Sequence, residues 1–117
     1  MSDLQCAATL LVTSSEGLDA DRLADSLRPH HVAAVYASPV AEAERAAAVV
    51  AQRLGVSRRT LPSGGRGHEA LDGVADLHRG ETVLVVGDAD QVPVVPAEGV
   101  AEVLVDGDGW TERAWQG

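Results

Sequence analysis

Polar and acidic side chains follow three apolar runs of this 117-residue sequence, at the points where buried strands would end. In a parallel sheet the carboxyl ends of the strands meet at one edge, and ligands bind there. Carboxylates at such an edge can hold a hard cation or move protons, whereas hydroxyls become nucleophiles only beside a base. We therefore expect a candidate site at this edge. Its positions are Thr13, Ser14, Ser15, Glu16, Glu42 and Asp88.

Two interpretations of the carboxylates remain open. Glu16, Glu42 and Asp88 could converge on a cation, either a metal such as magnesium or calcium or the amine of a ligand or partner. Alternatively, Glu42 complements the positive end of a helix and Asp88 caps a turn. Isolated carboxylates without a ligand motif favour the second interpretation, so we expect no metal and no cofactor.

The remaining reactive side chains do not complete a catalytic motif. No histidine is placed to link Ser14 or Ser15 to Asp88, so a Ser-His-Asp arrangement is not expected. The four histidines show no metal-ligand spacing; they are His30, His31, His68 and His78. Arg66 and His68 lie on or beside a glycine-rich loop and could reach over the strand ends, although a solvated loop is the alternative. We expect no catalytic residue of a familiar type.

Strand and helix patterns alternate along the chain and indicate which elements position these residues. The predicted strands are Ala7–Thr13, His31–Ala37, Thr82–Val86, Val100–Val105 and an edge strand over Trp110–Trp115. The predicted helices are one capped by Asp19 and stopped by Pro29, one with Ser38 as N-cap, Pro39 first and Gly55 after its end, and one over Glu69–His78. This order predicts a single α/β domain over residues 1–117, with helices on both faces of a mostly parallel sheet.

Composition narrows the classes of partner. Eighteen Asp and Glu against nine Lys and Arg give a formal charge of −9, which repels nucleic acid and anionic membranes. The single cysteine, Cys6, forms no internal disulfide, and we find no signal segment and no apolar run of membrane length. These features favour a cytoplasmic protein whose partner is neither nucleic acid nor a membrane.

Three segments, in order, resemble the histidine phosphatase (phosphoglycerate mutase-like) superfamily, and the tail of the chain agrees with them. Leu10–Glu16 stands where that family has an apolar strand running into Arg-His-Gly-Glu, and Tyr36–Ala43 is similar to its Tyr-Ser-Ser-Pro-Leu-x-Arg-Ala. Gly80–Ala89 resembles Gly-x-Thr-Val-Leu-Val-Val-Ser-His-Gly, and Asp106–Trp110 looks like the closing hairpin of many members. The resemblance implies a three-layer α/β/α fold. It also implies a reduced cap, because Ser63–His68 leads almost directly into the next helix.

The departures from the family motifs fall on its catalytic positions. Two arginines and two histidines are replaced, by Thr13, Ser14, Glu42 and Asp88. No carboxylate stands in register with the family's acidic proton donor in Leu61–Gly65. Phosphoryl transfer needs concentrated positive charge and a suitable nucleophile, and a neutral to anionic pocket provides neither. The resemblance therefore implies a scaffold without the family's phosphatase activity.

Three functions remain in competition. The first is a catalytically inactive protein that acts by binding a partner protein or as a subunit of a homo-oligomer. The second is a small-molecule enzyme with rewired acid/base chemistry that uses Glu42 or Asp88. The third is a phosphatase-like domain completed by a partner, which the acidic replacements disfavour. We expect the first.

Overall fold

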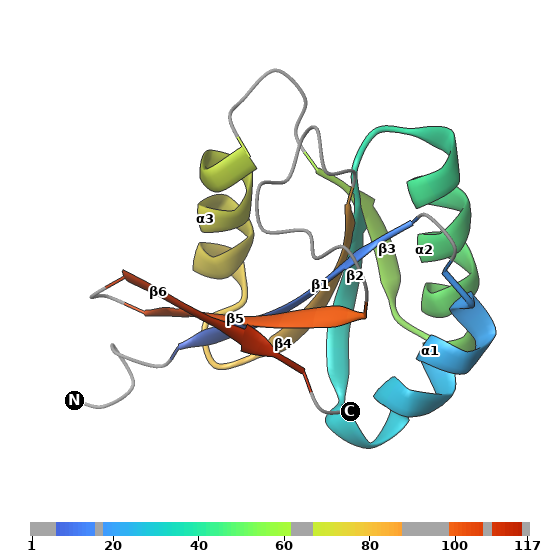
Figure 1. Ribbon diagram of the computed structural model, residues 1–117, viewed down its shortest axis with the longest axis horizontal. Helices are drawn as coiled ribbons and strands as arrows, with labels where there is room; N and C mark the ends of the chain where they lie inside the picture. The colour runs from blue at the N-terminus through green and yellow to red at the C-terminus, as the bar shows by residue number, and fades with distance from the viewer. Residues whose placement is uncertain (1–6, 16–17, 62–66, 88–98, 107–108, 116–117) are drawn as a thin grey trace.

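The computed structural model describes residues 7–15, 18–61, 67–87, 99–106 and 109–115. The strands are β1 Ala8–Ser14, β2 Val32–Ala37, β3 Ser57–Thr60, β4 Thr82–Gly87, β5 Val100–Asp106 and β6 Gly109–Ala114. The helices are α1 Ala20–Leu27, α2 Ala41–Leu54 and α3 Gly67–Leu77, and the 3-10 turn η2, Arg28–His30, follows α1 directly. Strands and helices alternate as far as β4, and a hairpin of β5 and β6 follows (Figure 1).

The strands form one sheet in the order β3-β2-β4-β1-β5-β6. The pairs β1–β4, β2–β4 and β2–β3 are parallel, whereas β1–β5 and β5–β6 are antiparallel. β1 and β4 lie at the centre, and their continuous apolar sequences follow from burial on both faces. The predicted α/β fold with a mostly parallel sheet is confirmed.

Two cores lie on the two faces of the sheet. Successive side chains of a strand point to opposite faces, so Leu11 packs under α1 and α2 whereas Leu10 packs under α3. Ala43 and Ala47 are fully buried on α2, where small side chains let the helix lie close to the sheet. Figure 1 shows α1 and α2 on one side of the sheet and α3 on the other. The expected α/β/α layering is confirmed.

The first turn of α2 corrects one prediction. Ser38 is not the N-cap, because the helix begins at Ala41 after Val40, whose side chain makes no capping hydrogen bond. The Ser38 N–H instead donates to the Val86 carbonyl at 3.0 Å, so this residue still pairs with the sheet. This hydrogen bond extends the β2 backbone by one residue, so α2 starts at Ala41 and not at Pro39 as predicted.

The end of α2 is closed by Gly55, as predicted. Gly55 has φ 71° and ψ 32°, and its N–H points to the carbonyls of Ala51 and Gln52. The Val56 N–H donates to the Ala51 carbonyl at 3.0 Å, which completes a Schellman turn.

A Gly55→Ala variant is expected to lose about 1 kcal/mol of the free energy of unfolding, because a Cβ is disfavoured at positive φ. No atom lies within 4 Å of the added Cβ, so backbone strain is the whole effect. Urea denaturation measures it, with Gly73→Ala, inside α3 and equally open, as the control. A Gly55→Ala variant as stable as the parent chain would contradict this account.

Strand β3 was not predicted. Its four residues are all exposed, and Arg58 and Arg59 interrupt any apolar pattern, so the sequence carries no signal of burial. β3 forms only because β2 offers a partner at the edge of the sheet. At the opposite edge, the expected edge strand is present as β6.

The turn before β2 also differs from the prediction. β2 begins at Val32, not at His31, which has left-handed backbone with φ 52°. His30 lies in η2, where its ring meets Trp115 edge to face at a centroid distance of 5.2 Å. The adjacent histidines therefore belong to a turn, and Trp115 packs against the core of α1 and α2.

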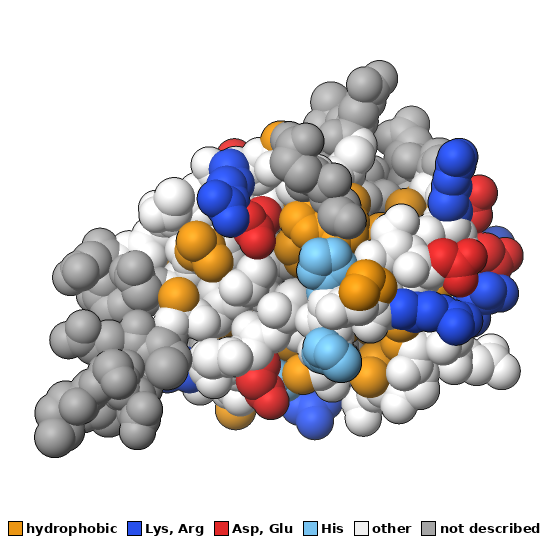
Figure 2. Space-filling model, turned by 90° about the horizontal axis from the view of Figure 1, so that it is seen from below, with side chains coloured by type: hydrophobic (Ala, Val, Ile, Leu, Met, Phe, Trp, Pro, Cys, Tyr) orange, Lys and Arg blue, Asp and Glu red, His pale blue; other side chains and the backbone are white. Residues whose placement is uncertain are grey.

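Several charged side chains on the surface pair with one another. Arg53 of α2 meets Asp21 and Asp25 of α1 at 3.2 and 3.3 Å. Arginine and acidic side chains lie next to one another at one end of the face in Figure 2. None of the helices in the described part is long and apolar enough to cross a membrane.

Candidate functional site

The carboxyl end of β1 carries the first three candidate residues. Thr13 is 3% exposed, and its hydroxyl donates to the Gly99 carbonyl at 3.1 Å. Ser14 lies opposite Gly87 of β4 in the parallel register, and the Ser15 N–H donates to the Gly87 carbonyl at 3.3 Å. The Thr13 hydroxyl is thus bonded to the chain just before β5 and is not available to a ligand.

Glu42 reaches the same edge from α2. It lies in the first turn of the helix, with Glu44 beside it, and it is exposed. Its carboxylate complements the partial positive charge of the helix N-terminus, as the simpler interpretation of this residue predicts.

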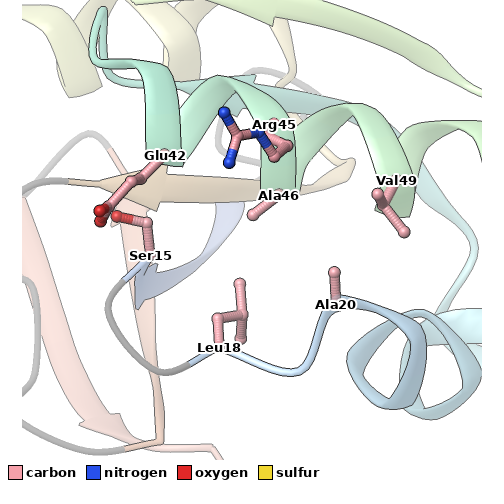
Figure 3. Close-up of a pocket in the computed structure, with 7 residues that line it drawn as sticks. All are labelled: Ser15, Leu18, Ala20, Glu42, Arg45, Ala46 and Val49. Carbon is pink, nitrogen blue, oxygen red and sulfur yellow. The ribbon is translucent and has the colours of Figure 1, made fainter.

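A pocket of about 420 Å³ opens between α2 and the segment that joins β1 to α1. Its lining residues in the described part are Ser15, Leu18, Ala20, Glu42, Arg45, Ala46 and Val49. Glu42 and Ser15 extend toward each other at one end, and Leu18, Ala20, Ala46 and Val49 form the rest of the wall around the Arg45 stem (Figure 3). An apolar wall with a carboxylate and a hydroxyl at one end suits a small organic group with a polar end.

The structure brings together two of the predicted residues, Ser15 and Glu42, and separates Thr13 from them by burying it. Glu16, Asp88 and Arg66 lie outside the described residues. His68 belongs to the first turn of α3, and its side chain is likewise outside the described part. The described lining therefore tests only part of the predicted site.

Arg45 is the residue of the pocket that sequence reasoning missed. It follows Glu42 by three positions on α2, and this spacing places two residues on one face of a helix. No ion pair joins Arg45 to any described residue. The described lining carries one carboxylate and one guanidinium, so its formal charge is zero.

A second cluster of polar groups lies on the other face of the sheet. His78 is 7% exposed, with Nδ1 2.8 Å from Glu81 Oε1 and Nε2 2.9 Å from the Tyr36 hydroxyl. Arg59 donates to the same hydroxyl at 3.4 Å. The sequence offered one signal, the three-residue spacing of His78 and Glu81, which the sequence-based predictions did not use.

No group of three or more His, Cys, Asp or Glu side chains is arranged to hold a metal ion within the described residues. The cation site suggested by Glu16, Glu42 and Asp88 is not tested, because two of its three members lie outside them.

Solved structures of other proteins share this fold. A phosphoglycerate mutase from Plasmodium falciparum superposes with a TM-score of 0.66 at 12% identity, over 95% of this chain and 91% of that chain. Bacillus stearothermophilus YhfR superposes with a TM-score of 0.72 at 18% identity, over 92% of this chain and 96% of that chain. No protein-family model matches the sequence, and no curated protein matches it. The chain therefore has a phosphoglycerate mutase-like fold, as the sequence resemblance implied.

Proposed function

We propose that this chain is a catalytically inactive, histidine phosphatase-like protein that acts by binding, either to a partner protein or as a subunit of an oligomer. The fold supports the likeness to histidine phosphatases, since a phosphoglycerate mutase shares it at 12% identity. The side chains at the strand ends support the loss of catalysis.

The observation that carries the proposal is the chemistry at the end of β1. Thr13 stands where the family resemblance expects an arginine for the phosphoryl oxygens, and its hydroxyl is bonded to Gly99. Ser14 stands where the nucleophilic histidine is expected. A neutral hydroxyl bonded to a backbone carbonyl gives no positive charge to a phosphoryl group in the transition state.

The positions of the histidines agree with this proposal. His30 and His31 precede β2, and His78 follows α3 just before β4, so all three lie at the amino ends of the parallel strands. The candidate site lies at the carboxyl ends. None of these three imidazoles can therefore replace a nucleophile or base beside Ser14.

Purified protein is expected to hydrolyse p-nitrophenyl phosphate no faster than buffer does. The measurement is the release of p-nitrophenol, with an active histidine phosphatase as the positive control. Hydrolysis that is abolished in a Ser14→Ala variant and retained in a Ser26→Ala variant, which changes an exposed serine of α1, would overturn the proposal. Light scattering tests whether the chain acts as a subunit of an oligomer, since a self-associating chain gives a multiple of the 12.1 kDa monomer mass.

The pocket favours one alternative, an enzyme with rewired acid/base chemistry. Glu42 points toward Ser15 across the end of an apolar pocket, so its carboxylate could act as a base on a neutral substrate (Figure 3). If so, hydrolysis of p-nitrophenyl acetate falls about a hundredfold in Glu42→Gln. The matched control is Glu44→Gln, in the same helical turn and outside the pocket lining. Equal rates in both variants would leave binding as the function.

A further inference from the structure

The edge strand β3 carries two adjacent arginines in an acidic protein. The chain has twice as many acidic as basic residues, and arginines 28, 53, 79 and 113 each meet a carboxylate. Arg58 and Arg59 are exposed and form no ion pair with any described residue. Within the described part of the chain, no carboxylate therefore neutralises these two adjacent arginines.

The two arginines lie on opposite faces of the sheet. Arg59 pairs in register with Tyr36 and donates to its hydroxyl, so it lies on the face covered by α3. Arg58 pairs with Val35, which belongs to the core under α2, and Thr60 on the same face donates to Glu44 of α2 at 3.3 Å. A strand added beside β3 would therefore meet a guanidinium on each face.

The backbone of β3 offers hydrogen-bonding groups to such a strand. The Leu61 N–H donates to the Ala37 carbonyl of β2 at 2.7 Å, so the backbone groups of Leu61 point inward to the sheet. Backbone groups alternate in direction along a strand, so those of Arg59 and Ser57 also point inward. Those of Arg58 and Thr60 point outward, where β3 has no neighbouring strand among the described residues.

We propose that β3 is a docking site for an extended acidic segment of a partner protein, which adds to the sheet as a further strand. The Arg58 and Thr60 backbone groups would pair with the added strand, and the two arginines would select a carboxylate on each of its faces, that is, at neighbouring positions of the partner segment. This inference names a partner chemistry for the proposed binding function. It concerns a different surface from the pocket, so either can fail alone.

A second copy of the chain fits this edge less well. In a two-fold antiparallel pairing of β3 with β3, each register that pairs the centre of the strand places Arg58 opposite Arg58 or Arg59 opposite Arg59. Like charges directly opposite each other destabilise a sheet. An acidic partner converts this repulsion into attraction.

A labelled peptide of repeating Glu-Glu-Thr-Thr, which places glutamates on both faces of an extended strand, tests the proposal by fluorescence anisotropy with the full chain. The control peptide has the same charge but prolines in place of all the threonines, which removes backbone donors along both edges of the strand. Binding of the first peptide, loss of binding with the second, and amide NMR shifts confined to Ser57–Thr60 are expected. Equal binding of both peptides would overturn strand addition, and no binding of either would overturn the docking site.

Variants at Arg58 separate charge from backbone pairing. Arg58→Ala is expected to weaken the peptide about threefold, as for one exposed ion pair. Arg58→Pro also removes the outward N–H and leaves the hydrogen bonds to β2 intact. It should weaken peptide binding by about a further tenfold. Arg22→Ala, at an exposed position of α1, is the matched control and should bind the peptide as tightly as the parent chain does. Identical affinities of Arg58→Ala and Arg58→Pro would contradict the proposal, provided that circular dichroism shows both folded.

Anion binding and self-association are the alternatives that the same experiment distinguishes. If inorganic phosphate at the same charge concentration displaces the peptide, the site binds anions in general, and the strand proposal is wrong. If light scattering shows a dimer that Arg58→Pro dissolves, the occupant is a second copy.

Discussion

A His78→Ala variant is expected to lose about 3 kcal/mol of the free energy of unfolding. In the parent chain His78 is 7% exposed, and its ring forms hydrogen bonds with Glu81 through Nδ1 and with the Tyr36 hydroxyl through Nε2. Arg59 can only donate to that hydroxyl. In the neutral ring, the Tyr36 hydroxyl donates to Nε2, and Nδ1–H donates to Glu81. Alanine removes both bonds and leaves a cavity beside the core under α3.

Urea denaturation followed by circular dichroism measures the loss. Arg79→Ala is the matched control, because it removes the neighbouring side chain and an exposed ion pair with Asp76. We expect the control to change stability by less than about 1 kcal/mol. Tyr36→Phe, which keeps the ring and removes the hydroxyl, should cost about 1 kcal/mol. A His78→Ala variant that is no less stable than Arg79→Ala would contradict a structural role for this network.

Replacing Leu84 with alanine is expected to cost about 3 to 4 kcal/mol of the free energy of unfolding. Leu84 is fully buried at the middle of β4, between β1 and β2, and packs in the core under α1 and α2. The truncation removes apolar contacts and leaves a cavity that a central strand cannot close by moving. Because a domain of this size has about 5 to 15 kcal/mol in total, the variant should unfold at much lower urea.

Leu77→Ala is the control for Leu84→Ala, since the same atoms are removed from a side chain that is 70% exposed. This change should stay within about 0.5 kcal/mol of the parent chain. If the two leucine variants unfolded at the same urea concentration, the central position of β4 in the core would be wrong.

The sequence predicted the central strands well because strands buried on both faces have a recognisable apolar pattern. β1, β2 and β4 are almost continuously apolar, as strands covered on both faces must be. β3 has no such apolar pattern, since all four of its residues are exposed. The Ser38 cap was predicted from local preference, and its hydrogen bond to Val86 in the sheet prevailed over that preference. Local patterns thus identified what is buried, whereas contacts between distant segments decided the edge strand β3 and the start of α2.

The candidate site was predicted in part for the same reason. Ser15 and Glu42 meet at one edge because the strands are parallel, and the alternation of strands and helices predicts parallel strands. The hydrogen bond from the Thr13 hydroxyl to the Gly99 carbonyl could not be predicted in this way. The two residues are 86 positions apart, and their contact depends on β1 and β5 lying side by side. Arg45 was missed because its place in the pocket depends on how α2 packs beside the β1–α1 segment.

The sequence by itself determined the α/β class and the residue types at the ends of the parallel strands. These follow from hydrophobic pattern and residue identity, which are local properties. Only the tertiary structure decided that Thr13 is buried, that Arg45 lines a pocket with Glu42, and that Arg58 and Arg59 lie on an edge strand. Each of these depends on contacts between segments far apart in the chain, and such contacts leave no periodic signal in the residues that make them.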